Sequence, residues 1–213
     1  MQPAGDASAF YRLAQTVLRL TFSTLQGLQV RGLENVPARG GCILVCNHLS
    51  WLDPPVLGCS LRHRQLHFMA KKELFERPWL GPLIRSLGAF PVERGQADRK
   101  SLRLALQLLG AGRIVCLFPE GTRGDGGAMG AWHVGLAMLA HHAQVPVLPA
   151  ALRGTRALLE DRHLKLPRSP ILVKFGAPIE LESITGPARS RLQQIQERSL
   201  EAVQHLLQAG DGE

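Results

Sequence analysis

Short apolar runs alternate with helical patterns along almost the whole chain, and this alternation restricts the possible folds more than any other feature. The runs expected to form strands are residues 28–31, 42–46, 66–70, 89–92, 114–118, 145–151 and 171–175. The segments expected to form helices are residues 7–28, 55–61, 79–87, 99–110, 131–142 and 187–207. This order predicts an α/β domain with a mixed, largely parallel central sheet that is flanked by helices.

The first expected helix, residues 7–28, is amphipathic, and its only charges are the basic residues Arg12 and Arg19. It is too interrupted to span a bilayer, which takes about 20 mostly apolar residues, but it suits a helix that lies in the membrane interface. The alternative is a helix packed against the domain, and the two can hold for opposite faces. We therefore divide the chain into an N-terminal amphipathic membrane-associating helix at residues 1–28, one domain at residues 29–208 and a frayed tail at residues 209–213.

A histidine and a carboxylate directly follow the apolar run 42–46, in the segment Asn47-His48-Leu49-Ser50-Trp51-Leu52-Asp53. Five residues of regular helix rotate a side chain by about 140°, so His48 and Asp53 can meet only across an irregular turn. An aspartate that accepts one ring N–H of a histidine fixes its tautomer, and the imidazole can then take a proton from a hydroxyl. The alternative is that Asp53 only caps a helix beginning near Pro55.

A second group of polar residues follows the apolar run 114–118. Pro119 ends strand pairing and Glu120 presents a carboxylate. Gly121 lets the backbone approach a ligand, and Arg123 offers a planar fork that suits phosphate. The alternative is a local salt bridge between Glu120 and Arg123 on a turn.

Four blocks, in order along the chain, resemble the glycerophospholipid acyltransferases, a family that includes bacterial 1-acyl-glycerol-3-phosphate acyltransferase. The blocks are His48 through Asp53, residues 88–94 (GAFPVER), residues 118–123 (FPEGTR) and residues 145–149 (VPVLP). The resemblance covers about residues 31–180 and identifies residues 29–208 as an acyltransferase domain. The chain departs from the family after the third block, where His133 and its neighbours replace a frequent lysine.

The resemblance also implies the site and the reaction. The implied residues are the catalytic pair His48 and Asp53 and the substrate-binding residues Glu120, Gly121, Arg123, Arg94 and Lys71. For Lys71, the alternative is a solvated charge at the end of a strand. The implied reaction transfers a fatty acyl group from acyl-CoA or acyl-ACP, as co-substrate, to the free hydroxyl of a lysophosphatidic acid. Phosphatidic acid is the product, and no cofactor is needed.

The charge of the chain favours anionic partners, because 25 Lys and Arg against 17 Asp and Glu give a formal net charge of +8. An anionic membrane surface, a lysophospholipid and an acyl carrier protein all fit, whereas no motif typical of nucleic-acid binding is present. No export signal begins the chain, so we expect the cytoplasmic face of the inner (plasma) membrane. The four cysteines lack metal-binding spacing, so we expect buried thiols and no metal.

Other activities stay open at this point. A sibling acyltransferase could use another lyso-lipid, such as a lyso-ornithine lipid, or glycerol 3-phosphate. A non-catalytic lipid-binding protein could retain the site, although the intact His48, Asp53 and Glu120 argue against it. A lysophospholipid hydrolase would result if water replaced the acceptor. Ser50 lacks the Gly-x-Ser-x-Gly setting of a hydrolase nucleophile, so we expect no covalent acyl-enzyme.

Overall fold

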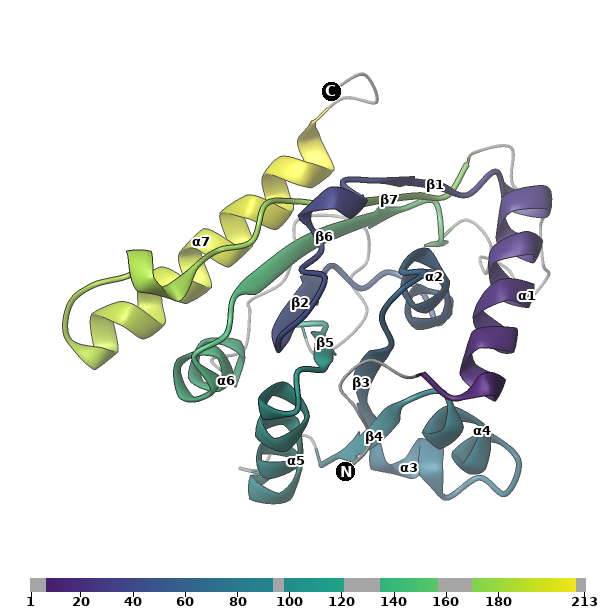
Figure 1. The fold of residues 1–213 in the computed structure, drawn as a ribbon, viewed down its shortest axis with the longest axis horizontal. Coiled ribbons are helices and arrows are strands. Elements are labelled where there is room, and N and C mark those ends of the chain that lie inside the picture. The colour runs from purple at the N-terminus through teal and green to yellow at the C-terminus, as the bar shows by residue number, and fades with distance from the viewer. Residues whose placement is uncertain (1–6, 94–97, 121–134, 157–169, 210–213) are drawn as a thin grey trace.

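A seven-stranded sheet lies at the centre of the computed structural model, which describes residues 7–93, 98–120, 135–156 and 170–209 (Figure 1). In these residues the strands are β1 (Gln29–Arg31), β2 (Cys42–Cys46), β3 (Leu66–Lys71), β4 (Ala89–Val92), β5 (Ile114–Leu117), β6 (Val147–Arg153) and β7 (Leu172–Phe175). Their order in the sheet is β1-β7-β6-β2-β5-β3-β4. Every neighbouring pair is parallel except β6 and β7, so the prediction of a mixed, largely parallel sheet is confirmed.

Helices cover both faces of this sheet (Figure 1). They are α1 (Ala9–Gln26), α2 (Asp53–Ser60), α3 (Lys72–Phe75), α4 (Leu80–Ser86), α5 (Arg99–Gly110), α6 (Gly135–Ala143) and α7 (Ala188–Gln208). Side chains of α1 and α2 pack on the face that contains Leu44, whereas α5, α6 and α7 pack on the face that contains Ile43. All of β2 is therefore buried, which explains why it appears in the sequence as an unbroken apolar run.

The expected elements agree closely with the observed ones. The bounds of α5, β2 and β4 are those predicted, and the other expected strands shift only at their ends. The helix expected at residues 131–142 is described from Gly135 onward, and residues 131–134 lie outside the described part. Helix α3 was not predicted, because a single helical turn is too short to show a helical period.

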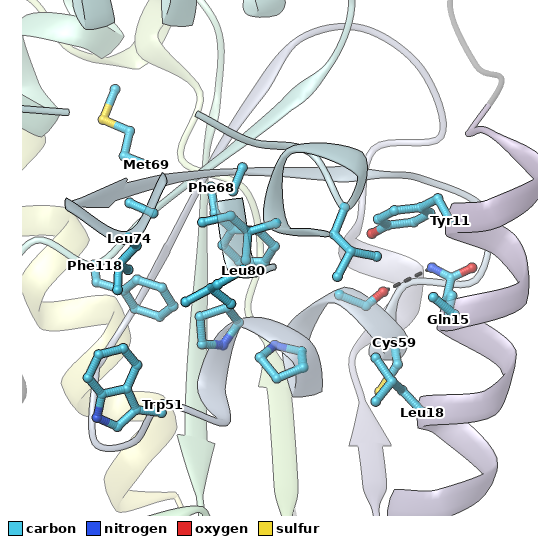
Figure 2. Close-up of a pocket in the computed structure, with 18 of the residues that line it drawn as sticks. Tyr11, Gln15, Leu18, Trp51, Cys59, Phe68, Met69, Leu74, Leu80 and Phe118 are labelled. Atoms are coloured by element: carbon cyan, nitrogen blue, oxygen red, sulfur yellow. Dashed lines mark hydrogen bonds between the residues drawn. The ribbon is translucent and has the colours of Figure 1, made fainter. Parts of the chain in front are cut away.

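Helix α1 packs against the domain through one side and leaves its other side exposed. The Gln15 side chain donates to the carbonyl oxygen of Gly58 at 2.9 Å (Figure 2). It also donates to the carbonyl oxygen of Leu61. The Arg19 guanidinium donates to the carbonyl oxygens of Cys59 and Ser60, each at 3.3 Å. The last carbonyls of a helix have no partner within the helix, so Gln15 and Arg19 satisfy those at the end of α2. The alternative, a helix packed against the domain, thus holds for this side of α1.

Among the described residues, no helix is both long and apolar enough to cross a membrane.

The cysteine prediction is also confirmed, since Cys42, Cys46, Cys59 and Cys116 are all buried and free. At the other end of the chain, Ala209 is the last described residue, and its carbonyl accepts a hydrogen bond from Lys174 Nζ at 2.8 Å. The rest of the expected tail, residues 210–213, lies outside the described part.

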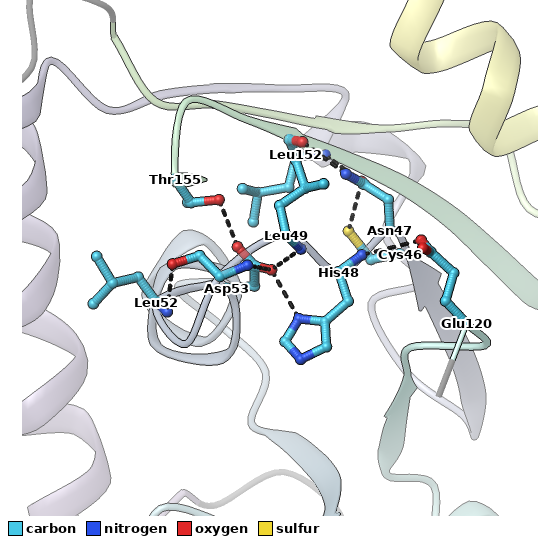
Figure 3. Close-up of polar contacts among 10 residues, drawn as sticks. Cys46, Asn47, His48, Leu49, Leu52, Asp53, Glu120, Leu152 and Thr155 are labelled. Atoms are coloured by element: carbon cyan, nitrogen blue, oxygen red, sulfur yellow. Dashed lines mark hydrogen bonds and ion pairs between the residues drawn. The ribbon is translucent and has the colours of Figure 1, made fainter. Parts of the chain in front are cut away.

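Asn47 extends the sheet by one rung beyond the end of β2. Its side-chain amide donates to the Leu152 carbonyl at 2.9 Å and accepts from the Leu152 N–H at 2.8 Å (Figure 3). These two bonds satisfy the buried N–H and carbonyl groups of Leu152, which face the end of β2. The residue directly before His48 is thus fixed to the neighbouring strand.

We predict that Asn47→Ala lowers the free energy of unfolding by about 2–4 kcal/mol, because it leaves two buried backbone groups of Leu152 unpaired. Urea denaturation followed by circular dichroism measures this change. Gln107→Ala, which removes an exposed amide from α5, is the control and should change stability by less than about 0.5 kcal/mol. Equal stability of the two variants would contradict the role given to Asn47.

Candidate active site

Polar side chains follow three neighbouring parallel strands at the edge where each strand ends. His48 comes after β2, Glu120 after β5 and Thr155 after β6, and β2 pairs with both of the other strands. The carboxyl ends of parallel strands meet at one edge of the sheet, which is where sites form in open α/β sheets. The sheet thereby brings together residues that are far apart in the sequence.

The Asp53 carboxylate is the centre of this group (Figure 3). Its Oδ2 accepts from the backbone N–H groups of Leu49, at 2.6 Å, and Ser50, at 2.7 Å, and lies 2.8 Å from His48 Nδ1. Its Oδ1 accepts from the Thr155 hydroxyl at 2.6 Å. Because an ionised carboxylate can only accept, Nδ1 of His48 carries the hydrogen, and Nε2 keeps its lone pair.

The predicted irregular turn between His48 and Asp53 is confirmed, and the alternative, in which Asp53 only caps the helix, is wrong. The residue at the N-cap of α2 is Leu52, and Asp53 is the first residue of the helix. Its fully buried side chain points back to the turn formed by Leu49 and Ser50 instead of capping later N–H groups. The demand for a buried carboxylate beside His48 outweighs the capping preference, since an unpaired charge at this depth would be costly.

The His48 ring is held on a second side by Phe118. The two rings are stacked, with centroids 4.2 Å apart and planes 22° apart. The backbone N–H of His48 also donates to Glu120 Oε1 at 3.3 Å. Ring stacking, the Asp53 hydrogen bond and the Glu120 contact together leave His48 little freedom to change its orientation.

His48 lies in the wall of an apolar cavity of about 500 Å³. Trp51 and Phe118 line the cavity near His48, whereas Tyr11, Gln15 and Leu18 of α1 line its far side (Figure 2). The cavity also contacts residues from α2, β3, α3 and α4, which are Pro54, Pro55, Gly58, Cys59, Phe68, Met69, Ala70, Lys71, Leu74, Leu80, Ile84 and Leu87. A proton acceptor beside an apolar cavity suits chemistry on an amphiphilic substrate.

The Cys59 thiol and the Tyr11 phenol, which also line the cavity, are poor nucleophiles. Burial raises the pKa of the Cys59 thiol to about 11 and that of the Tyr11 phenol to about 12. Both groups stay protonated near neutral pH, so neither provides a thiolate or a phenolate nucleophile. The buried Ser50 hydroxyl accepts from the Leu52 N–H at 3.2 Å, within the turn. General-base chemistry by the His48–Asp53 pair is therefore the best-supported use of the site.

The described residues include four of the seven predicted site residues. His48 and Asp53 are paired, Glu120 contacts the His48 backbone, and Lys71 is exposed at the end of β3 and lines the cavity. Gly121, Arg123 and Arg94 lie outside the described part. The described residues contain no cluster of His, Cys, Asp and Glu that could hold a metal ion.

Two residues that hold the His48–Asp53 pair in place are not predicted from the sequence. Thr155 is 102 positions from its partner Asp53, and no local pattern marks it. The sequence places Phe118 only at the end of a predicted strand and in the third block. Adjacent parallel strands end at the same edge of a sheet, and β5 is the neighbour of β2. A pairing of these two strands would therefore have placed Phe118 near His48.

Comparison with known proteins agrees with this geometry. The family model described as Acyltransferase matches residues 27–153, a range that contains His48, Asp53 and Glu120. The chain belongs to the acyltransferase family.

The similar proteins include two bacterial enzymes and a solved structure. The acyltransferase is 35% identical over 144 residues to the 1-acyl-sn-glycerol-3-phosphate acyltransferase of Bacillus subtilis, covering 68% of this chain and 71% of that relative. It is 29% identical over 182 residues to the same-named protein of Streptococcus pneumoniae, covering 84% of this chain and 66% of that relative. The crystal structure of the 1-acyl-sn-glycerophosphate acyltransferase PlsC from Thermotoga maritima matches with a TM-score of 0.73 and 26% identity. That match covers 94% of this chain and 81% of PlsC.

We predict that Thr155→Val lowers the turnover of this acyltransferase by about tenfold, because Asp53 loses one of its charge-assisted hydrogen bonds. Initial rates of thiol release from an acyl thioester, at several acceptor concentrations, measure kcat and KM separately. Turnover should fall more than KM rises, since Thr155 orients the pair and touches no substrate. Thr155→Ser, which retains the hydroxyl, should recover most of the rate, and failure of that rescue would contradict the assignment.

Proposed function

We propose that this acyltransferase transfers a fatty acyl group to the free hydroxyl of 1-acyl-glycerol 3-phosphate and so produces phosphatidic acid. The observation that supports this most is the His48–Asp53 pair in the wall of an apolar cavity. The names of the bacterial relatives agree with this acceptor.

The proposed reaction is a direct transfer. Nε2 of His48 accepts the proton of the acceptor hydroxyl while that oxygen bonds to the carbonyl carbon of the thioester. The carbon–sulfur bond then breaks, and the thiol leaves with the proton that His48 returns. Asp53 stabilises the imidazolium that forms between these two transfers. No metal or cofactor takes part, and acyl-CoA or acyl-ACP is a co-substrate.

We assign the apolar cavity to an acyl chain. The described wall consists largely of aliphatic and aromatic side chains, and it extends from His48 to α1. Burial of each methylene contributes about 0.8 kcal/mol, so a long chain gains much of its binding free energy here.

The phosphate of the acceptor is assigned to basic side chains near His48. Lys71 is exposed in the cavity wall and offers a flexible cation at the same strand edge. By family resemblance, Arg94, Gly121 and Arg123 complete this contact together with Glu120. An ammonium and two guanidinium groups suit a phosphate monoester better than they suit an uncharged lyso-lipid.

We further propose that the enzyme works at the cytoplasmic face of the inner membrane and contacts an anionic surface through α1. Phe10, Leu13, Val17 and Leu20 follow one another at helical spacing on the exposed side of α1, and each is about half exposed or more. A row of apolar side chains on a helix with basic charges suits the interface of an anionic bilayer. The basic net charge also suits an acyl carrier protein as donor.

We predict that His48→Ala abolishes acyl transfer, with a loss of at least about a hundredfold, while its circular dichroism spectrum stays unchanged. Purified enzyme in mixed micelles is incubated with acyl-CoA or acyl-ACP and a panel of lyso-acceptors, and the products are identified by mass spectrometry. Phosphatidic acid formed from lysophosphatidic acid, and lost in the variant, is the expected result.

The other outcomes of this assay separate the alternatives. Transfer only to a lyso-ornithine lipid or to glycerol 3-phosphate would retain the chemistry and replace the acceptor. Free fatty acid without a diacyl product would indicate a hydrolase. Absence of transfer from either donor to any acceptor would favour a lipid-binding protein.

We predict that Gly58→Leu shifts the preferred acyl donor to a shorter chain, with about a tenfold loss for long-chain thioesters. A Cβ at Gly58 would lie 3.6 Å from Tyr11 Oη and 4.0 Å from a ring carbon of Phe68, so Ala fits and Leu fills the cavity. Competition between thioesters of different length measures the shift. Gly110→Leu is the matched control, since nothing lies within 4 Å of a Cβ there. An unchanged chain-length preference for Gly58→Leu would move the acyl chain out of this cavity.

A further inference from the structure

Exposed apolar side chains gather on the elements that line the acyl cavity. In the described part of the chain, eleven large apolar side chains are exposed, and eight of them belong to α1, to the turn before α2 or to α4 and its N-cap. These eight are Phe10, Leu13, Val17, Leu20, Leu25, Trp51, Trp79 and Leu83. All three of these elements also contribute residues to the cavity wall. The concentration of apolar surface around one cavity is therefore greater than scattered surface residues would give.

Trp79 is the most exposed of these side chains, with 69% of its surface accessible. It is the N-cap residue of α4, and the next residue, Leu80, lines the cavity. Leu83 is also exposed on α4. Trp79 takes no part in the catalytic pair or the cavity wall, so neither the proposed reaction nor the packing explains this large apolar side chain.

The charges around Trp79 suit the headgroup region of an anionic bilayer. Residues 71–86 contain four basic and two acidic side chains. Arg77 precedes Trp79 in the sequence and Arg85 follows it, and both are exposed. The Arg85 guanidinium carbon lies 4.7 Å from the centroid of the Phe75 ring. Tryptophan prefers the membrane–water interface, and arginine side chains can extend to phosphates from there. Trp79, Leu83 and these arginines therefore combine apolar and cationic groups in the way that interfacial segments do.

We propose that Trp79 and Leu83 form a second contact with an anionic phospholipid bilayer, separate from the one made by α1. This inference rests on the membrane association in the proposed function and adds a residue-level contact on α4. With α1 and α4 both at the bilayer and both lining the cavity, an acyl chain enters the cavity between them from the lipid phase. The enzyme is thereby oriented with the His48 side of the sheet toward its substrates.

The test uses the fluorescence of Trp79 in the whole chain. The three tryptophans are Trp51, Trp79 and Trp132, so the double variant W51F/W132F retains Trp79 alone and leaves the proposed contact intact. Vesicles of phosphatidylglycerol and phosphatidylcholine are prepared with and without bromine on the acyl chains of the phosphatidylcholine. Co-sedimentation of the same samples measures the bound fraction. We expect a blue shift of Trp79 emission on binding, and brominated lipid should quench the emission to about half or less.

Each other result overturns the inference in a distinguishable way. Co-sedimentation without quenching would leave the α1 contact in place and remove Trp79 from the bilayer. Absence of co-sedimentation would overturn the membrane part of the proposed function as well, while acyl transfer in micelles tests the reaction separately. A shift in Trp79 emission caused by acyl carrier protein and not by vesicles would assign this surface to a protein partner.

A variant series in the native background provides the second measurement. Trp79→Ser should weaken vesicle binding by about tenfold and should slow transfer to acceptors embedded in vesicles, while transfer to a short-chain soluble acceptor stays unchanged. Leu104→Ser, which alters an exposed leucine of α5 on the opposite side of the sheet, is the matched control. Equal vesicle binding by the two variants would contradict the proposal.

Discussion

The buried Asp53 carboxylate is the contact on which the active site depends. A carboxylate at this depth is tolerated only when hydrogen-bond donors surround it, and the protein supplies four donors. Two are backbone N–H groups of the turn after β2, one is the hydroxyl of Thr155 after β6, and one is the His48 ring. The same interactions that allow the charge to be buried therefore fix the tautomer and the orientation of the His48 ring.

Parallel pairing explains how such distant residues reach one carboxylate. Strand β2 lies between β5 and β6, and all three end at the same edge of the sheet. Glu120 and Phe118 approach His48 from the β5 side, and Thr155 approaches Asp53 from the β6 side. An antiparallel neighbour would have placed its start, not its end, at this edge. The reversal of direction occurs only at β7, beyond the strands that build the site.

The sequence predicted the parts of this arrangement that local patterns determine. Buried strands such as β2 appear as apolar runs, and His48 and Glu120 directly follow such runs, so their place at the strand ends could be inferred. Thr155 could not be inferred, because its role depends on the pairing of β6 with β2. The alternative of a capping Asp53 fails for the same reason, since helix preference is local and the demand for a buried partner of His48 is not.

Helix α1 joins the proposed membrane contact to the cavity in a single rigid element. Its inner side supplies Tyr11, Gln15 and Leu18 to the far wall, and its hydrogen bonds to the end of α2 hold it in place. Its outer side presents the apolar row. Asp53 begins the same helix α2 whose last carbonyls Gln15 and Arg19 satisfy. About two turns of helix therefore separate the Asp53 carboxylate from the carbonyls that hold α1, so α2 connects the His48–Asp53 pair to the far wall of the cavity.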